Sequence, residues 1–332
     1  MTAAFNKQNT HILHWLYSGW LLLMLTLAHV STAQTQPVSP AAKPSLEPEI
    51  FQHCRFSGQR CLQHIDRFLL AADPTSIYGY ELMLLKLDSL FVLRRDAELF
   101  ALTSKLVLKT AAPDAFKARL YIYHAKVLYG MQQKAQANDY LQQATDLLDA
   151  LQQAMPNPLT QLRLINVKLY SDSDYQTGYQ QLLQLEKQLQ RSQDAVLKYD
   201  LYNNLGHFSH FLQLEQDSLR YRQLALQAIE QMDHPHKVAE AHYNLARVHS
   251  FVRQWPQAEQ HFAQALWHYS SIHDSTMVNL SLMYLAEAMW WQQKTIAATA
   301  IFARLQPAKI PNSSQQFFKR IQRLLTADSA TP

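Results

Sequence analysis

Residues 241–268 read AHYNLARVHSFVRQWPQAEQHFAQALWH, and this stretch decides the fold. Its apolar residues recur every three or four positions, which is the spacing of one helical face. Pro256 falls at a joint, where one helix ends and the next begins. Ala246 and Ala258 stand twelve residues apart on either side of that joint. Because two helices that cross closely need small residues at their contact, the stretch predicts a helical hairpin.

The same pair of small residues recurs along most of the chain. The later member of each pair repeats every 40 or 41 residues as Ala97, Ala137, Gly178, Ser218, Ala258 and Ala298. Twelve residues before these positions lie Leu85, Ala125, Asn166, Gly206, Ala246 and Ala286. Apolar or small residues follow each later member by four and seven positions, as Ala101 and Ser104 do in the first unit. Two residues depart from the pattern: Asn166 as an earlier member, and Arg222 four positions after Ser218. One hairpin cannot bury its own apolar face, so the repeat predicts stacked hairpins in one elongated domain.

At these positions the chain resembles the tetratricopeptide repeat family. Three units carry the resemblance, at Leu245, Ala246, Ala258, Phe262 and Ala265, at Tyr202, Leu205, Gly206, Ala225 and Leu226, and at Leu285, Ala286, Ala298 and Phe302. The period exceeds the family's 34 residues and is similar to that of long-helix variants in bacterial regulatory and sensor proteins. The resemblance implies an all-α, right-handed α-solenoid of about six helical hairpins over residues 76–312.

The N-terminal residues are expected to direct export. Residues 1–33 resemble a secretory signal peptide, with an apolar run over 15–30 and small residues before a cleavage site after Ala33. The alternative is a retained anchor, although the run is shorter than the roughly 20 residues of a membrane span. Residues 34–48 contain four prolines and are expected to form an extended tether. We expect the mature protein in the periplasm, or secreted, without membrane insertion.

Both ends of the array are expected to carry caps. Residues 49–75 contain Cys54 and Cys61, which should form a disulfide in an oxidising compartment. A zinc site with His53 and His64 is the less favoured alternative. At the other end, residues 313–327 place Phe317, Ile321, Leu324 and Leu325 on one face, with Ser313 as the N-cap, which predicts a C-terminal capping helix.

Composition and motifs argue against several classes of function. The six glycines form no phosphate-binding loop, and the net charge of +4 is too small to argue for nucleic acid binding. No metalloprotease or serine-hydrolase motif occurs in the sequence. The close pairs His207 and His210, His234 and His236, and Asp172 and Asp174 are better explained by helix surfaces and caps than by metal binding or catalysis. We therefore expect no enzyme activity, no metal and no cofactor.

Four tryptophans gather toward the C-terminal end, at positions 255, 267, 290 and 291. We expect Trp267 and Trp290 in the core. Trp290 and Trp291 are neighbours about 100° apart on a helix, so one of the two must point elsewhere.

The family resemblance implies a partner-binding groove lined by the first helix of each hairpin. The contact positions lie two residues before and one residue after the small residue, and here they hold Asn204, His207, Asn244, Arg247, Tyr284 and Glu287. Asn both donates and accepts hydrogen bonds, which suits binding to a peptide backbone. The alternative is an ordinary solvated polar face. The favoured function is an exported scaffold for a protein or peptide partner, and the alternative is a component similar to a sensor ectodomain of a membrane signalling system.

Overall fold

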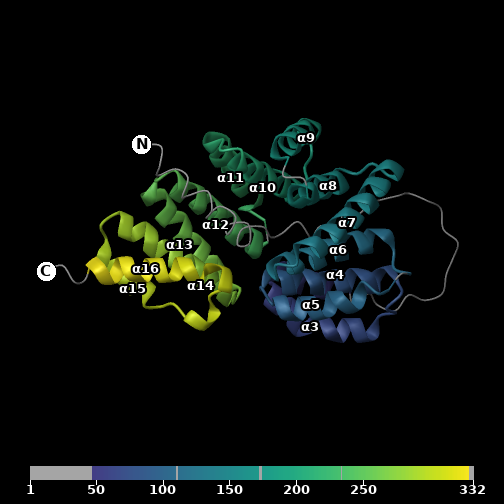
Figure 1. Cartoon of the computed structure of the whole chain (residues 1–332), viewed down its shortest axis with the longest axis horizontal. Coiled ribbons are helices and arrows are strands. Elements are labelled where there is room, and N and C mark those ends of the chain that lie inside the picture. Colours follow the sequence, from purple (N-terminus) through teal and green to yellow (C-terminus); the bar gives the residue numbers. More distant parts are fainter. Residues whose placement is uncertain (1–46, 110, 172–173, 233, 329–332) are drawn as a thin grey trace.

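Antiparallel pairs of helices make up the array in the computed structural model, which describes residues 47–109, 111–171, 174–232 and 234–328 (Figure 1). The six hairpins are α4 (Ile77–Val92) with α5 (Asp96–Leu106), α6 (Asp114–Gly130) with α7 (Lys134–Ala154), α8 (Pro158–Ser171) with α9 (Tyr175–Gln188), α10 (Ala195–Phe211) with α11 (Glu215–Ile229), α12 (Pro235–Phe251) with α13 (Trp255–Ser271), and α14 (Ser275–Trp291) with α15 (Thr295–Phe302). No strand occurs in the described part of the chain. The predicted all-α solenoid of six hairpins is confirmed. Residues 1–33, the expected signal peptide, and 34–46 of the expected tether lie outside the described residues, whereas residues 47 and 48 begin α2.

The paired small residues lie where the two helices of a hairpin touch. Ala246 and Ala258 are both completely buried, as are Ala286 and Ala298. In the fourth hairpin the Ser218 hydroxyl donates a hydrogen bond of 3.2 Å to the carbonyl oxygen of Gly206, which shows the direct approach of the two backbones. The twelve-residue spacing therefore marks the crossing point of each pair.

The register predicted for the first hairpin is wrong by two residues. Ala97 and Ala101 are exposed, and the buried face of α5 consists of Leu99, Thr103 and Leu106. The partner residue twelve positions earlier is then Leu87, which is completely buried. Leucine on both sides of the contact replaces the small pair found in later hairpins, so the search for small residues selected the wrong positions.

The turns inside the hairpins share one backbone conformation. Arg94, Gln132, Gln213, Arg253 and Gln293 all have a positive φ, between 55° and 63°. In the fifth hairpin Arg253 N–H donates to Ser250 O at 3.1 Å and Gln254 N–H donates to His249 O at 2.8 Å. This pair of bonds is the Schellman motif, in which glycine usually occupies the left-handed position. In all five hairpins the positive-φ residue lies seven positions after the first residue of the helix crossing and five positions before the second, as Arg253 does between Ala246 and Ala258. This constant spacing fixes the register of the five hairpins.

Helices at both ends complete the core. At the C-terminal end, η2 (Asn312–Ser314) precedes α16 (Gln315–Asp328), so the helix begins two residues later than predicted. Its residues Ile321 and Leu325 are buried against the last two hairpins, and Phe317 and Leu324 pack beside them. Between η2 and α15 lies the short η1 (Pro307–Lys309). The C-terminal capping helix is confirmed.

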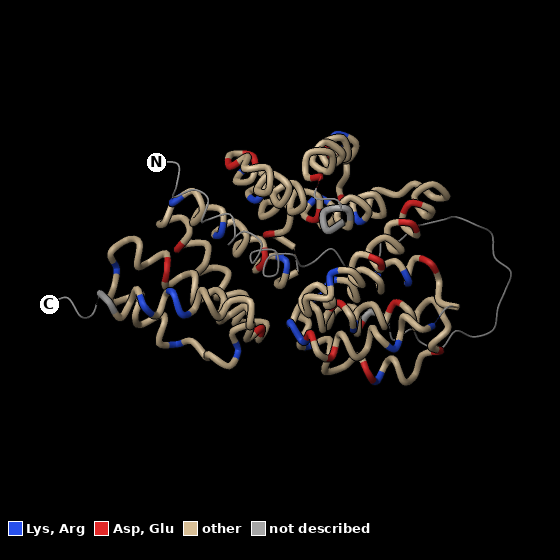
Figure 2. The backbone as a smooth tube through the Cα atoms, in the orientation of Figure 1, with Lys and Arg blue, Asp and Glu red and all other residues tan. Residues whose placement is uncertain are grey.

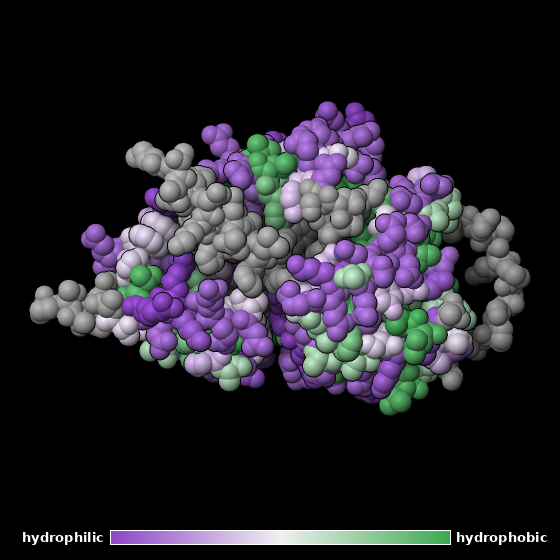
Figure 3. Space-filling model, viewed as in Figure 1, coloured by the Kyte–Doolittle hydropathy of each residue, from purple (hydrophilic) through white to green (hydrophobic). Residues whose placement is uncertain are grey.

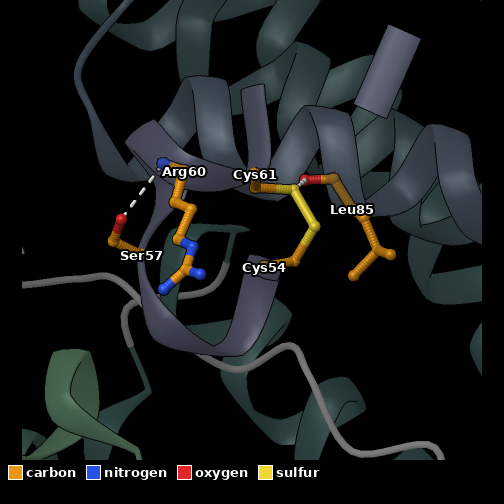
Figure 4. The surroundings of a disulfide bond; sticks show 5 residues. All are labelled: Cys54, Ser57, Arg60, Cys61 and Leu85. Carbon is orange, nitrogen blue, oxygen red and sulfur yellow. Dashed lines mark hydrogen bonds between the residues drawn. A yellow bond between two sulfur atoms is a disulfide. The ribbon is translucent and has the colours of Figure 1, made fainter. Parts of the chain in front are cut away.

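The N-terminal end is formed by α2 (Glu47–Phe56) and α3 (Gly58–Ala71), joined by the predicted Cys54–Cys61 disulfide (Figure 4). Ser57 caps α3 by accepting a hydrogen bond of 3.1 Å from Arg60 N–H. Cys61 Sγ lies 3.9 Å from the carbonyl oxygen of Leu85, so the disulfide packs directly on α4. The rings of His53 and His64 stack on each other at 4.2 Å.

The array curves so that its two ends form lobes. Helices α3 to α7 lie in one lobe and α12 to α16 in the other, with α8 to α11 between them (Figure 1). Figure 3 shows a narrow crevice between the two lobes in this view. Helix α2 contacts α12, and Phe56 packs against the core of the C-terminal lobe, so the ends of the array meet. Among the described helices, none is both long enough and apolar enough to cross a membrane.

The burial of the tryptophans matches the expectation for Trp290 but not for Trp267. Trp267 is 65% exposed, so its expected place in the core is wrong. It lies on the outward side of α13, next to the buried residue Leu266. Trp290 packs against the core, whereas Trp291 is 50% exposed and stacks on Trp255 with ring centres 5.3 Å apart. The adjacent pair therefore points in different directions, as helix geometry requires.

The turn conformation leads to a stability prediction. Replacing Gln293 with Gly should raise the free energy of unfolding by about 0.5 to 1 kcal/mol, because glycine takes up the left-handed conformation without the Cβ clash. Gln293 is exposed, so little packing is lost. Urea unfolding of the purified protein measures the change.

The matched control is Gln264→Gly, which puts the same substitution at an exposed site in the middle of α13. It should lower the free energy of unfolding by about 1 kcal/mol. If both variants were destabilised equally, the proposed cost of the turn would be wrong.

Candidate functional site

The six residues predicted to bind a partner lie on α10, α12 and α14. All are buried, with 2 to 8% of each residue exposed, so none is the freely solvated side chain of the alternative interpretation. We call the surface formed by the first helix of each hairpin the inner face. Asp88 on α4 and Lys237 on α12 are close enough for the lysine charge to influence the pKa of the carboxyl group, although more than 140 residues separate them. The first helices α4 and α12 therefore come near each other at these two residues.

The predicted residues contact each other and their neighbours. Asn204 accepts a hydrogen bond from Asn166 and donates one of 2.7 Å to the carbonyl oxygen of Asp200. Asn244 donates to Asn203 Oδ1 at 3.2 Å. These bonds link α8, α10 and α12. The polar residue Asn166, an exception to the small-residue pattern, is thus part of an asparagine ladder across three hairpins.

Aromatic and ionic contacts continue the inner face into the last hairpin. The Arg247 guanidinium lies 4.3 Å from the centre of the Tyr284 ring, a cation–π contact, and it donates to the Tyr243 hydroxyl at 3.2 Å. Glu287 forms an ion pair with Arg320 of α16. The Tyr284 ring also stacks on Phe317 at 4.5 Å. The capping helix is therefore connected to the inner face.

Arg222, the second exception to the pattern, belongs to the same network. It starts on α11 and reaches the inner face by passing Gly206, where a Cβ atom would lie only 2.8 Å from its Nε. Its guanidinium donates to Asn203 O at 3.1 Å and to His207 Nδ1 at 2.8 Å. A side chain at position 206 would therefore displace the buried Arg222 from this path.

The register fixed by the turns extends the predicted set toward the N-terminus. The predicted residues His207, Arg247 and Glu287 each directly follow the crossing residue of their first helix, in α10, α12 and α14. The equivalent residues are Asp88 in α4 and Lys126 in α6. Asp88 also forms an ion pair of 3.1 Å with Arg119. The sequence interpretation missed Asp88 because its register in the first hairpin was shifted. Lys126 was in register and could have been found by extending the same rule.

Burial shifts the pKa values of the charged groups on this face. Burial raises the pKa of Asp88 to about 7, despite the opposing charges of Arg119 and Arg163. Burial lowers the pKa of Lys126 to about 8 and that of Arg163 to about 9. Desolvation penalises each charged form, and the surrounding opposite charges compensate only in part.

A second set of buried polar residues connects α10 with α12. Lys237 and Asp200 form an ion pair that is almost completely inaccessible to solvent. The Tyr199 hydroxyl donates a hydrogen bond of 2.5 Å to Glu240 Oε2. Burial raises the pKa of Glu240 to about 8, although the Tyr199 hydrogen bond and the Lys237 charge lower it. We therefore expect Glu240 to take up a proton when the protein folds near neutral pH.

The histidine and aspartate pairs considered for metal binding or catalysis contact other residues wherever the structure describes them. His207 bonds to Arg222, whereas the His210 ring meets the edge of Phe251. His236 Nε2 lies 4.0 Å from Asp274 Oδ2, and His234 is buried beside it in sequence. No group of three or more His, Cys, Asp or Glu residues among the described positions is arranged to hold a metal ion. Asp174 caps α9 by accepting from Thr177 N–H at 3.0 Å, and Asp172 lies outside the described residues.

Charge is distributed without a dominant sign. Figure 2 shows acidic and basic residues interspersed through both lobes. This mixed pattern agrees with the small net charge of the sequence.

Comparison with known proteins identifies the fold. No protein-family model and no curated protein matches the sequence. A Rap protein in complex with competence and sporulation factor superposes with a TM-score of 0.51 and 12% identity, covering 84% of this chain and 76% of that chain. BtubC from P. vanneervenii gives a TM-score of 0.43 and 12% identity, over 72% of this chain and 92% of the other.

A third solved structure is a signal-transduction ATPase with a tetratricopeptide repeat sensor from Pyrococcus horikoshii. Its TM-score is 0.47 at 13% identity, over 82% of this chain and 42% of that chain. At such low identities structural similarity defines the fold and not the function. The chain has a tetratricopeptide-like helical-repeat fold, as the sequence predicted.

The protonation of Glu240 leads to a pH-dependent prediction. Its pKa is about 4.5 when unfolded and about 8 when folded, so stability is lost as the pH rises from 4.5 to 8. Glu240→Gln keeps an acceptor for Tyr199 and removes the titration. The variant should match the wild type at pH 5 and exceed its free energy of unfolding by roughly 1 to 3 kcal/mol at pH 8.

Urea unfolding at both pH values tests this difference. Glu215→Gln is the control, because Glu215 is exposed in the first turn of α11. A gain for Glu240→Gln that is equal at pH 5 and pH 8 would show that Glu240 is not protonated in the folded protein.

Proposed function

We propose that the protein is an exported, non-enzymatic scaffold that binds a protein or peptide partner on its inner face. The contact residues of this proposal are Asn204, His207, Asn244, Arg247, Tyr284 and Glu287. One observation carries it: polar side chains occupy equivalent positions on successive first helices, and contacts between such helices join α8 to α10, α10 to α12 and α12 to α14. Polar side chains at equivalent positions along an array of stacked helices are suited to a partner that lies across several repeats.

The charges along the inner face fit an extended partner. Asp88 and Lys126 lie at one end of the series, Arg247 farther along, and Glu287 at the other end. A segment that follows the inner face would therefore meet charges of both signs in a fixed order. Complementary charges give specificity and orientation more than raw affinity.

The mutual contacts of these side chains also favour binding. Asn204 and Asn244 are held by hydrogen bonds, and Arg247 is held against two tyrosine rings. Side chains that are already ordered lose less conformational entropy when a partner binds. Arrays of stacked helices commonly form concave binding surfaces, and the Rap protein of similar fold was solved in complex with competence and sporulation factor.

Export is supported by the disulfide. Cys54 and Cys61 are paired, and such bonds persist in oxidising compartments such as the periplasm or the extracellular space. The apolar run over residues 15–30 provides the signal in this proposal.

Site-specific photo-crosslinking tests the binding face. A photoreactive amino acid at Lys126 or Arg163, both half-buried on the inner face, should give a discrete adduct in a periplasmic extract. The same amino acid at Gln223 or Gln264, exposed on the outer helices α11 and α13, serves as the control.

We expect adducts from the two inner positions and none of the same mass from the two outer positions. Adducts that form equally at all four sites, or only at Gln223 and Gln264, would contradict binding on the inner face. Circular dichroism of each variant confirms that the array has remained folded.

A further inference from the structure

Four histidines meet between α12 and α13. His242 and His249 are seven residues apart on α12, and His261 and His268 are seven residues apart on α13, so each pair follows one helical stripe. Because the helices are antiparallel, the stripes interleave. The sequence interpretation did not find this group, since its members meet only when the hairpin closes.

The rings form a continuous stack. His268 stacks on His242 with ring centres 5.7 Å apart, and His249 stacks on His261 at 5.5 Å. Between the two stacked pairs, His242 Nδ1 and His261 Nδ1 share a hydrogen bond of 3.0 Å. Among the described residues, these rings do not belong to a group of three or more ligands arranged to hold a metal ion. We call this group the histidine stack.

The shared hydrogen bond limits the number of protons in the stack. A neutral imidazole has one donor nitrogen and one acceptor nitrogen, whereas a protonated imidazole has two donors. The bond between the two Nδ1 atoms survives when neither ring or only one ring is charged. When both rings are protonated, two donors and two like charges face each other at hydrogen-bond distance.

The surroundings provide little compensation for positive charge. His242 and His249 are buried, and His261 and His268 are half-buried. From α11, Glu230 acts on His268 only, and His249 bonds to the neutral side chain of Gln254 at 2.7 Å. Within the described residues, α2, α10 and α14 contribute no charged group that acts on these four rings. Of the charged groups nearby, Arg55 of α2 acts on His234, and Asp274 at the start of α14 lies beside His236.

We propose that the histidine stack is an acid-sensitive joint that holds α12 against α13 at neutral pH and loosens the fifth hairpin when its rings become charged. Acid breaks the Nδ1 to Nδ1 hydrogen bond and places like charges along the interface. The loosening is centred on α12, which also carries Asn244 and Arg247, but it requires no partner. Protonation of histidine clusters is a general way to destabilise an interface.

The direction of the pH dependence follows from the burial of the rings. Burial lowers the pKa of His242 and of His261 to about 4, and neighbouring histidine charges lower both further. The unfolded chain takes up protons near pH 6.5 while the folded stack does not. Stability is therefore complete above pH 6.5 and is lost as the pH falls from 6.5 toward 4.

Hydrogen exchange of the full chain, corrected for intrinsic rates, tests the joint at pH 7 and pH 5. In the wild type, α12 and α13 should lose protection at pH 5 by at least about tenfold relative to α8 and α9. The hairpin of α8 and α9 contains no histidine and provides the internal control. Equal changes in the two hairpins would overturn the proposal.

Substitution separates the stack from other titrating groups. In the double variant His242→Gln with His261→Gln, the extra loss of protection at pH 5 should fall to less than half of the wild-type value. The matched control is His64→Gln, which alters a stacked histidine in the N-terminal helices and should behave as the wild type. An unchanged acid response in the double variant would overturn the proposal.

A single variant covers the case in which the double variant does not fold. His268→Gln changes a half-buried ring at the end of the stack, and the Trp267 ring lies 4.6 Å from that histidine. Wild-type tryptophan fluorescence should fall between pH 7 and pH 5 as His268 becomes charged and quenches Trp267. The fall should be absent in His268→Gln, and its persistence there would contradict protonation of the stack.

Discussion

The crossing of two helices at small residues is the constraint on which the rest of the structure depends. Ala246 against Ala258 brings α12 and α13 together without a gap, and Gly206 against Ser218 does the same for α10 and α11. Larger side chains there would separate the helices and open the core between them. Because each hairpin packs mainly on its neighbours, the array repeats this contact as it grows.

The inner face adds a second constraint. The residue after each contact position lies on the first helix of its hairpin, and the polar residues there that are buried must find partners. They do so through the asparagine ladder, through Arg247 on Tyr284 and through Arg222 passing Gly206. The same buried environment shifts the pKa values of Asp88 and Glu240 upward. Burial of the inner face therefore accounts both for its packing contacts and for the chemistry of the candidate site.

The period and chemistry of the sequence predicted the hairpins, the disulfide and the C-terminal helix, because these depend on spacing along the chain. The first register was wrong because Leu87 and Leu99 replace the small pair. The left-handed turns were missed because arginine and glutamine occupy positions where glycine is usual. Burial of the six predicted contact residues and the meeting of four histidines depend on tertiary geometry, which neither composition nor spacing reveals.

Unfolding of the variant Ala258→Phe measures the central contact most directly. Phenylalanine at this completely buried position should overpack the crossing with Ala246 and lower the free energy of unfolding by about 1 to 3 kcal/mol. Ala263→Phe places the same side chain at an exposed site on α13 and should cost much less. If Ala258→Phe unfolded at the same urea concentration as the wild type, or no earlier than Ala263→Phe, the helix crossing described for this protein would be wrong.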